Sequence, residues 1–142
     1  MVARFFYQLG LAQPHLGGKL PAGAGAGFGA APARVMFVAQ SPGRNENLSG
    51  VPLVGESGKL FQRALRDVGI DIAHTFRTNV NLCITPENKP GTASQRTACR
   101  PWLEMQIAAV DPDVIVTLGD TAYRAFLPDE PGKITDIRGG VW

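Results

Sequence analysis

The sequence is poor in the side chains that most often bind metals or form cross-links. Its 142 residues include two cysteines, Cys83 and Cys99, and two histidines, His15 and His74. Two cysteines form one disulfide at most, and a single disulfide adds little stability to a chain of this size. This scarcity excludes a disulfide-rich scaffold and leaves too few cysteines for a four-cysteine metal site.

Long apolar runs are absent as well. No segment approaches the roughly 20 consecutive apolar residues of a membrane helix, and the amino-terminal region lacks the pattern of a signal peptide. Apolar residues still make up 44% of the chain, which is too large a share for a disordered protein. The length favours one domain. We therefore expect a soluble, cytoplasmic protein with a single globular domain and no membrane contact.

Neither sign of charge is in large excess. The net charge is +2, which does not by itself indicate a nucleic-acid partner. The basic residues are unevenly placed, because Arg4, Lys19, Arg34 and Arg44 all precede Glu46, the first acidic residue. A weakly basic unstructured tail and a DNA-binding arm would both give this pattern.

The amino-terminal part of the chain divides into two segments. Residues 1–16 hold an apolar cluster, Phe5 to Leu9, that fits either a short helix docked on the domain or a disordered end. Residues 17–33 hold six glycines, six alanines and two prolines, a composition typical of a linker. The GxGxxG spacing of a dinucleotide site is not met there.

From residue 34 to residue 142, short apolar segments alternate with longer amphipathic ones, a pattern typical of an α/β domain. Short apolar segments predict strands over Val35–Ala39, Thr75–Val80 and Val114–Leu118, and amphipathic segments predict helices over Gly58–Val68, Ala93–Val110 and Asp120–Leu127. Strands joined by helices favour a three-layer α/β/α fold with a short, mostly parallel sheet. Three strands are visible, and the chain stops where a fourth would begin, so we expect the domain to be incomplete at its carboxyl end.

Polar residues follow the carboxyl ends of the predicted strands, where open parallel sheets bind their ligands. Gln40 and Gly43 follow the first strand, Asn79 ends the second, and Asp120 follows the third. The segment from residue 39 to residue 58 is rich in Gly and Pro. It fits either a binding loop that aims backbone N–H groups at a ligand or a flexible surface loop.

The segment AQSPGRNENLSGVPLVGESG resembles the first motif of family 4 uracil-DNA glycosylases, GEAPGxxEDxxGxPFVGxxG. Eight residues are in register: Pro42, Gly43, Glu46, Gly50, Pro52, Val54, Gly55 and Gly58. Three later segments are also similar to family motifs: TNVNLCITPENK, TACRPWLEMQI and VDPDVIVTLGDTAYRAFL. The likeness covers about three-quarters of the chain, from Arg34 to Gly139, and omits the tail and linker.

The resemblance implies an N-glycosylase that acts on uracil flipped out of single- or double-stranded DNA. It assigns uracil binding to Asn79, Asn88, Gly43 and the residue at the stacking position, Leu53. An Asn amide can donate to uracil O4 and accept from N3–H, whereas cytosine presents the opposite pattern. The structural alternative for both asparagines is a residue in a turn whose side chain forms hydrogen bonds with nearby backbone groups.

Two departures from the family pattern bear on catalysis. Gln40 stands where the family has Glu, so it carries no negative charge to orient water or offset a sugar cation. Glu46 is the candidate carboxylate in its place, although a solvated loop Glu would give the same pattern. Leu53 offers apolar contact without the flat face of an aromatic ring.

Cys83 and Cys99 align with two of the four thiolates that hold the [4Fe–4S] cluster of this family. A cubane takes one thiolate on each iron, so a cluster is possible here only if two further ligands are supplied. Relic thiols, a zinc or cluster remnant with His15 or His74 as ligands, and a disulfide are the alternatives.

If the chain binds DNA, we expect phosphate contacts through Lys59, Lys89, Arg96 and Arg100, and binding that weakens with salt. The family's last motif, an HPS-like segment whose His assists the leaving uracil, would follow the end of this chain. We therefore expect a DNA-repair glycosylase. The main alternative is a catalytically impaired module of the same fold that binds DNA or a protein partner, and a further one is a binder of small nucleotides at the same strand ends. The sequence indicates no oligomeric state.

Overall fold

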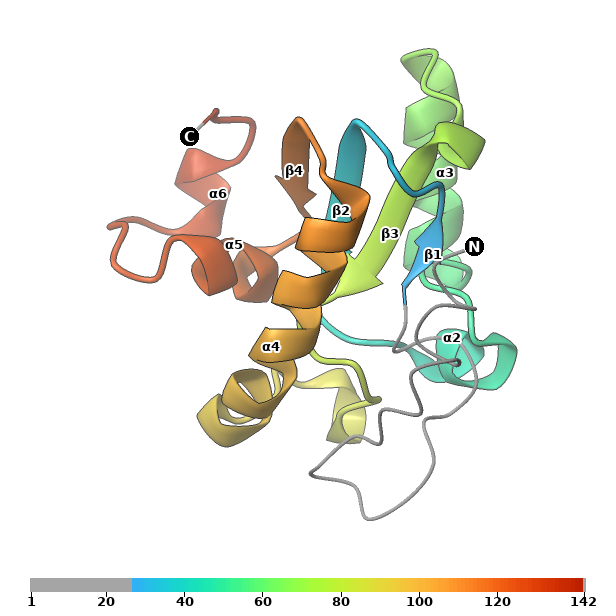
Figure 1. Ribbon diagram of the computed structural model, residues 1–142. Helices are drawn as coiled ribbons and strands as arrows, with labels where there is room; N and C mark the ends of the chain where they lie inside the picture. Colours follow the sequence, from blue (N-terminus) through green and yellow to red (C-terminus); the bar gives the residue numbers. More distant parts are fainter. Residues whose placement is uncertain (1–26, 142) are drawn as a thin grey trace.

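The computed structural model describes residues 27–141, which form a four-stranded sheet with helices on both faces (Figure 1). The strands are β1 (Phe28–Gly29), β2 (Val35–Ala39), β3 (Thr75–Asn79) and β4 (Val114–Thr117). The helices are α2 (Arg44–Ser49), α3 (Glu56–Asp67), α4 (Ala93–Val110), α5 (Asp120–Phe126) and α6 (Ile134–Ile137), with the 3-10 turns η2 (Ile72–His74) and η3 (Pro86–Asn88).

The centre of the sheet is parallel, as the sequence predicts. β2 pairs in parallel with β3 on one side and with β4 on the other, in the order β1-β3-β2-β4. Parallel neighbours need a long crossover, and here α3 lies between β2 and β3 in the chain and α4 between β3 and β4. The three predicted strands are confirmed, each within one residue at its end.

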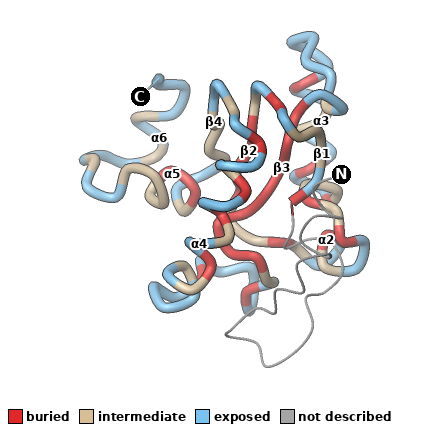
Figure 2. The backbone as a smooth tube through the Cα atoms, viewed as in Figure 1, coloured by how far each residue is buried: buried red, intermediate tan, exposed pale blue. Residues whose placement is uncertain are grey.

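Helices cover the sheet on two sides, which confirms the three-layer α/β/α fold. Met36, Val38 and Phe76 form one core cluster with residues of α4 and α5, and all three are fully buried. Phe37 points to the opposite face because side chains alternate along a strand. Its ring meets that of Phe61 in α3 edge-on, with centroids 4.7 Å apart. Figure 2 shows the resulting buried layer along β3 between more exposed helices.

The sheet has four strands where the sequence shows three, and the further strand expected beyond the carboxyl end stays a prediction. The fourth strand is β1, which comes from the predicted linker and pairs antiparallel with β3. Phe28 lies opposite Arg77, whose guanidinium carbon is 5.3 Å from the centre of the Phe28 ring. Two residues, Phe-Gly, carry no periodicity, so no pattern marks them as a strand. The predicted segment 1–16 and the linker as far as residue 26 lie outside the described residues.

Helix α4 begins and ends where the sequence predicts. Thr92 caps its amino end, because the Thr92 hydroxyl accepts from the Gln95 N–H while the Gln95 side chain accepts from the Thr92 N–H. Asp111 ends the helix in a left-handed conformation. Between residues 27 and 141, neither α4 nor any other helix combines the length and apolarity needed to cross a membrane.

Replacing Gly29 with alanine should detach β1 from the sheet. Gly29 has φ +136°, and a Cβ atom there would lie 2.0 Å from the carbonyl oxygen of Thr75. We expect Gly29→Ala to lower the free energy of unfolding by about 2–4 kcal/mol in urea titrations. Gly69→Ala is the control, since Gly69 has φ +74° with no atom within 4 Å of a Cβ, and should lose only about 1 kcal/mol. Equal losses would mean that β1 pairing contributes nothing.

Candidate active site

A cleft of about 710 Å³ opens at the carboxyl ends of β2 and β3. The parallel register aligns Ala39 with Asn79, so the loops that leave the two strands start side by side. The six residues that the sequence assigns to catalysis and uracil binding all line this cleft: Gln40, Gly43, Glu46, Leu53, Asn79 and Asn88. Their roles remain predictions, but the fold brings them to one place from four separate segments.

Asn79 lies deepest among the polar residues of the cleft. It is the last residue of β3 and only 2% exposed. Its side-chain Nδ2 is buried and has no hydrogen-bond partner among the described residues. A buried donor left unpaired costs about 1–3 kcal/mol. The amide therefore favours a ligand that brings an acceptor into the cleft.

Gln40 is held at both ends of its side-chain amide. Nε2 donates to the backbone carbonyl of Asn88 at 2.9 Å, and Oε1 accepts from the Thr121 hydroxyl at 2.9 Å. The side chain thus links the end of β2 to η3 and to the first turn of α5. An amide oxygen has two lone pairs, so Oε1 keeps one for a further donor such as water.

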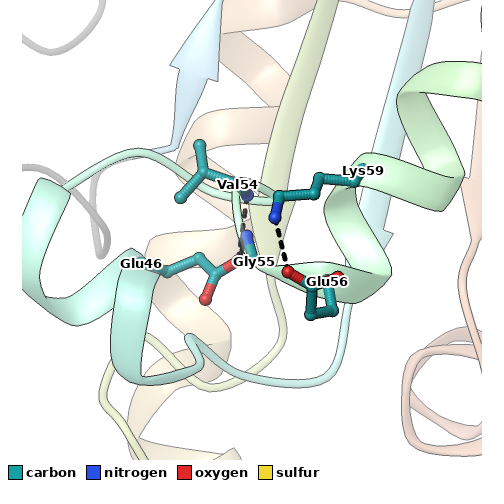
Figure 3. Close-up of polar contacts among 5 residues, drawn as sticks. All are labelled: Glu46, Val54, Gly55, Glu56 and Lys59. Carbon is teal, nitrogen blue, oxygen red and sulfur yellow. Dashed lines mark hydrogen bonds and ion pairs between the residues drawn. The ribbon is translucent and has the colours of Figure 1, made fainter.

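Glu46 is buried, so the alternative of a solvated loop glutamate is wrong. It lies in α2 with 8% of its surface exposed. Figure 3 shows its carboxylate turned toward the start of α3, where Oε1 accepts from the N–H groups of Val54 and Gly55 at 2.9 and 2.7 Å. One oxygen of this carboxylate is therefore already bonded to two backbone groups.

Leu53 and Asn88 both have left-handed backbones, with φ values of 59° and 55°. The Leu53 carbonyl accepts from the Gln62 side chain at 3.1 Å, and its backbone lies so close to Gly58 that a Cβ at residue 58 would be 2.1 Å away. Asn88 is exposed at the rim, and its N–H donates to the Thr85 carbonyl. Neither backbone depends on a contact made by the side chain.

The four predicted DNA contacts fall into two groups. Lys59 and Lys89 follow cleft residues in the chain and are exposed, and each pairs with a nearby carboxylate at 2.5 Å, that of Glu56 or Glu87. Arg96 and Arg100 instead line a second cavity, of about 680 Å³, together with residues of α5.

The arginines of the second cavity are anchored by backbone carbonyls. Arg96 donates to the Gly91 carbonyl, while Arg100 donates to the Ala125 carbonyl and pairs with the Glu104 carboxylate at 2.7 Å. These contacts fix the two guanidinium groups on the surface of α4. They leave N–H groups on both side chains for a further acceptor.

The two cysteines are not joined by a disulfide, so the structure contradicts the disulfide alternative. Burial, with the neighbouring Cys99, raises the pKa of Cys83 to about 11, and burial raises the pKa of Cys99. Neither group is thus predisposed to be a thiolate at neutral pH. Between residues 27 and 141, no group of three or more Cys, His, Asp or Glu side chains is arranged so that it could hold a metal ion. With two cysteines in the whole sequence, this chain's own residues do not fit a [4Fe–4S] cluster.

Sequence reasoning left two residues of the site unassigned, Asn81 and Thr121. The Asn81 side chain is buried and donates to the Gln40 carbonyl at 3.3 Å, and Thr121 holds the Gln40 amide. Both are polar residues close behind the end of a strand, which is the one signal that marks them in the sequence. Their partners are far away in the chain, so that signal does not reveal what they hold.

Comparison with known proteins extends the likeness beyond single motifs. The description "Uracil DNA glycosylase superfamily" belongs to a family model that matches residues 26–141. A type-4 uracil-DNA glycosylase of Thermotoga maritima is 39% identical over 106 residues, which are 75% of this chain and 55% of that protein. One from Sulfurisphaera tokodaii is 36% identical over 122 residues, 82% of this chain and 56% of that protein.

A type-5 uracil-DNA glycosylase of Pyrobaculum aerophilum is also similar, at 36% identity over 75 residues, 53% of this chain and 32% of that protein. The chain spans about half the length of the type-4 relatives it matches. The match of the family model includes all four strands and every segment that lines the cleft. The chain therefore belongs to the uracil-DNA glycosylase superfamily.

Proposed function

We propose that this chain recognises uracil flipped out of DNA and hydrolyses its N-glycosidic bond, as a DNA-repair glycosylase. The observation that carries the proposal is the buried amide nitrogen of Asn79, which has no partner among residues 27–141, in a cleft of about 710 Å³. A flipped base has to be enclosed and read along its hydrogen-bonding edge. Asn79 supplies a donor at the depth where a planar base would rest.

The Asn79 amide has the polarity that suits uracil. Nδ2 donates to O4 of the base, and the amide oxygen accepts from N3–H. Cytosine presents a donor and an acceptor in the reverse order, so the Asn79 amide would lose its pairing at a cost of about 1–3 kcal/mol for each buried group. Asn88 at the rim is the second amide that contacts the base in this proposal.

Hydrolysis breaks the bond between C1′ of the sugar and N1 of uracil, which leaves with the electron pair. Water adds to C1′, and the proton that it loses neutralises the uracil anion. The sugar gains positive charge and uracil gains negative charge along this path. Donors from Asn79 and from backbone N–H groups near Gly43 stabilise the uracil anion. The free lone pair of Gln40 Oε1 accepts a hydrogen from the attacking water and so orients it.

The second candidate is a catalytically impaired module of the same fold that binds DNA or a protein partner. Two observations favour it. Gln40 is neutral, and it is tied to Asn88 and Thr121, so it offers no charge to the sugar cation. Leu53 stands at the stacking position without an aromatic face.

Uracil release from a single-stranded oligonucleotide with one uracil tests the first proposal. We expect Asn79→Ala to lower the rate of release by about 100-fold or more, because the Asn79 amide reads the base and stabilises the leaving anion. Asn47→Ala is the matched control, since Asn47 lies in α2 outside the cleft, and it should keep the wild-type rate. Wild-type release by Asn79→Ala would contradict the assignment of the cleft.

The same oligonucleotide separates the two candidates. If the protein binds uracil-containing DNA preferentially but releases no uracil, even at high protein concentration, the second candidate, the catalytically impaired binding module, is supported. Absence of both release and preference would reject both candidates for DNA.

Binding to DNA should weaken with salt through the arginines of α4. We expect Arg96→Gln and Arg100→Gln each to reduce the slope of log Kd against log salt by about 0.7 on single-stranded DNA. Arg34→Gln removes the same charge just before β2, at the amino ends of the parallel strands and so at the end opposite the cleft. Arg34 pairs there with Asp113. This variant should leave the slope unchanged in fluorescence anisotropy titrations. Equal slopes in all three variants would show that Arg96 and Arg100 of α4 make no phosphate contact.

A further inference from the structure

Among residues 27–141, no basic side chain pairs with the buried carboxylate of Glu46. None of the ion pairs among residues 27–141 involves Glu46, although 92% of its surface is covered, as its exposure of 8% shows. Carboxylates are seldom buried unless a charge or several donors compensate them. The compensation here comes from the peptide backbone.

Two backbone N–H groups converge on one oxygen of this carboxylate. Val54 and Gly55 donate to Oε1 at 2.9 and 2.7 Å (Figure 3). Gly55 is the residue that caps the amino end of α3, a helix of 12 residues. The negative charge thus lies at the positive end of the α3 dipole, where it is favourable.

The glycines on either side of the carboxylate leave it just enough room. A Cβ at Gly43 would lie 2.6 Å from Oε2, and a Cβ at Gly55 would lie 3.1 Å from Oε1. The chain therefore closes around the Glu46 side chain from both ends of the loop. Gly43, Leu53 and Gly55 are at the same time part of the wall of the cleft.

We infer that Glu46 is a positioning residue: its carboxylate ties α2 to the start of α3 and so sets the wall of the base-binding cleft, and it takes no part in proton or water transfer. This inference rests on the proposed function for its effect on uracil. It replaces the expectation that Glu46 supplies the catalytic carboxylate. Gln at this position keeps the acceptor oxygen, whereas Ala removes it.

Amide hydrogen exchange and uracil-release kinetics on three variants test the inference. In Glu46→Ala we expect the Val54 and Gly55 amides to exchange at least about tenfold faster. The Val80 amide, which donates to the Ala39 carbonyl just after β3, should be unchanged. The KM for uracil-containing DNA should rise about tenfold, with a smaller change in kcat. Glu46→Gln should restore protection and KM to within about threefold of wild type, because its Oε1 still accepts both hydrogen bonds.

Glu56→Gln is the matched control. Glu56 lies in the first turn of α3, pairs with Lys59 and is exposed, so it carries the same charge near the same helix end without touching the loop (Figure 3). We expect exchange at Val54 and Gly55 to stay at the wild-type rate in this variant. Faster exchange there would show that helix-end charge alone holds the loop and would overturn the role of the Glu46 contacts.

The outcomes separate the inference from the proposed function. If Glu46→Gln loses kcat as completely as Glu46→Ala while its amides stay protected, the charge itself is needed for the chemistry and the inference is overturned. Unchanged exchange in Glu46→Ala would overturn it as well. If wild-type protein releases no uracil, the proposed function fails, yet the exchange rates still decide the positioning role. Should Glu46→Ala fail to fold, Glu46→Asp, one methylene too short for both N–H groups, replaces it and should show the same loss of protection.

Discussion

The parallel pairing of β2 with its two neighbours is the constraint on which the cleft depends. The ladder continues past the strands, since the Val80 N–H donates to the Ala39 carbonyl and the Leu118 N–H to the Val38 carbonyl, both at 2.8 Å. Three chain segments consequently leave the sheet at one edge and in fixed register. Every loop of the site is built on that edge, so the relative positions of its polar groups follow from the sheet.

Side-chain links then join loops that the sheet only brings near one another. The Gln40 side chain connects the end of β2 to η3 and α5, and the Asn81 side chain donates a hydrogen bond to the Gln40 carbonyl. On the other side of the cleft, Glu46 holds the start of α3. The cleft is thus fixed by polar contacts on both flanks, and each of these contacts joins residues from different elements.

The sequence was sufficient for the elements with a clear period and for six of the residues that line the cleft. Buried apolar strands and the capped helix α4 carry strong local signals, and the motif spacing placed Asn79 and Gly43 at one edge. The sequence did not reveal β1, because Phe28 and Gly29 are stabilised by pairing with β3 alone. It also left Glu46 undecided between solvent and site, since the donors that bury it are backbone N–H groups, which every residue but proline possesses.

The backbone of Leu53 is held by contacts in which its side chain takes no part. Its left-handed backbone is held by the Gln62 contact and by close approach to Gly58, and neither involves the Leu53 side chain. Neither contact requires a particular side chain at residue 53. A substitution there would change the apolar surface that lines the cleft while leaving both backbone contacts available.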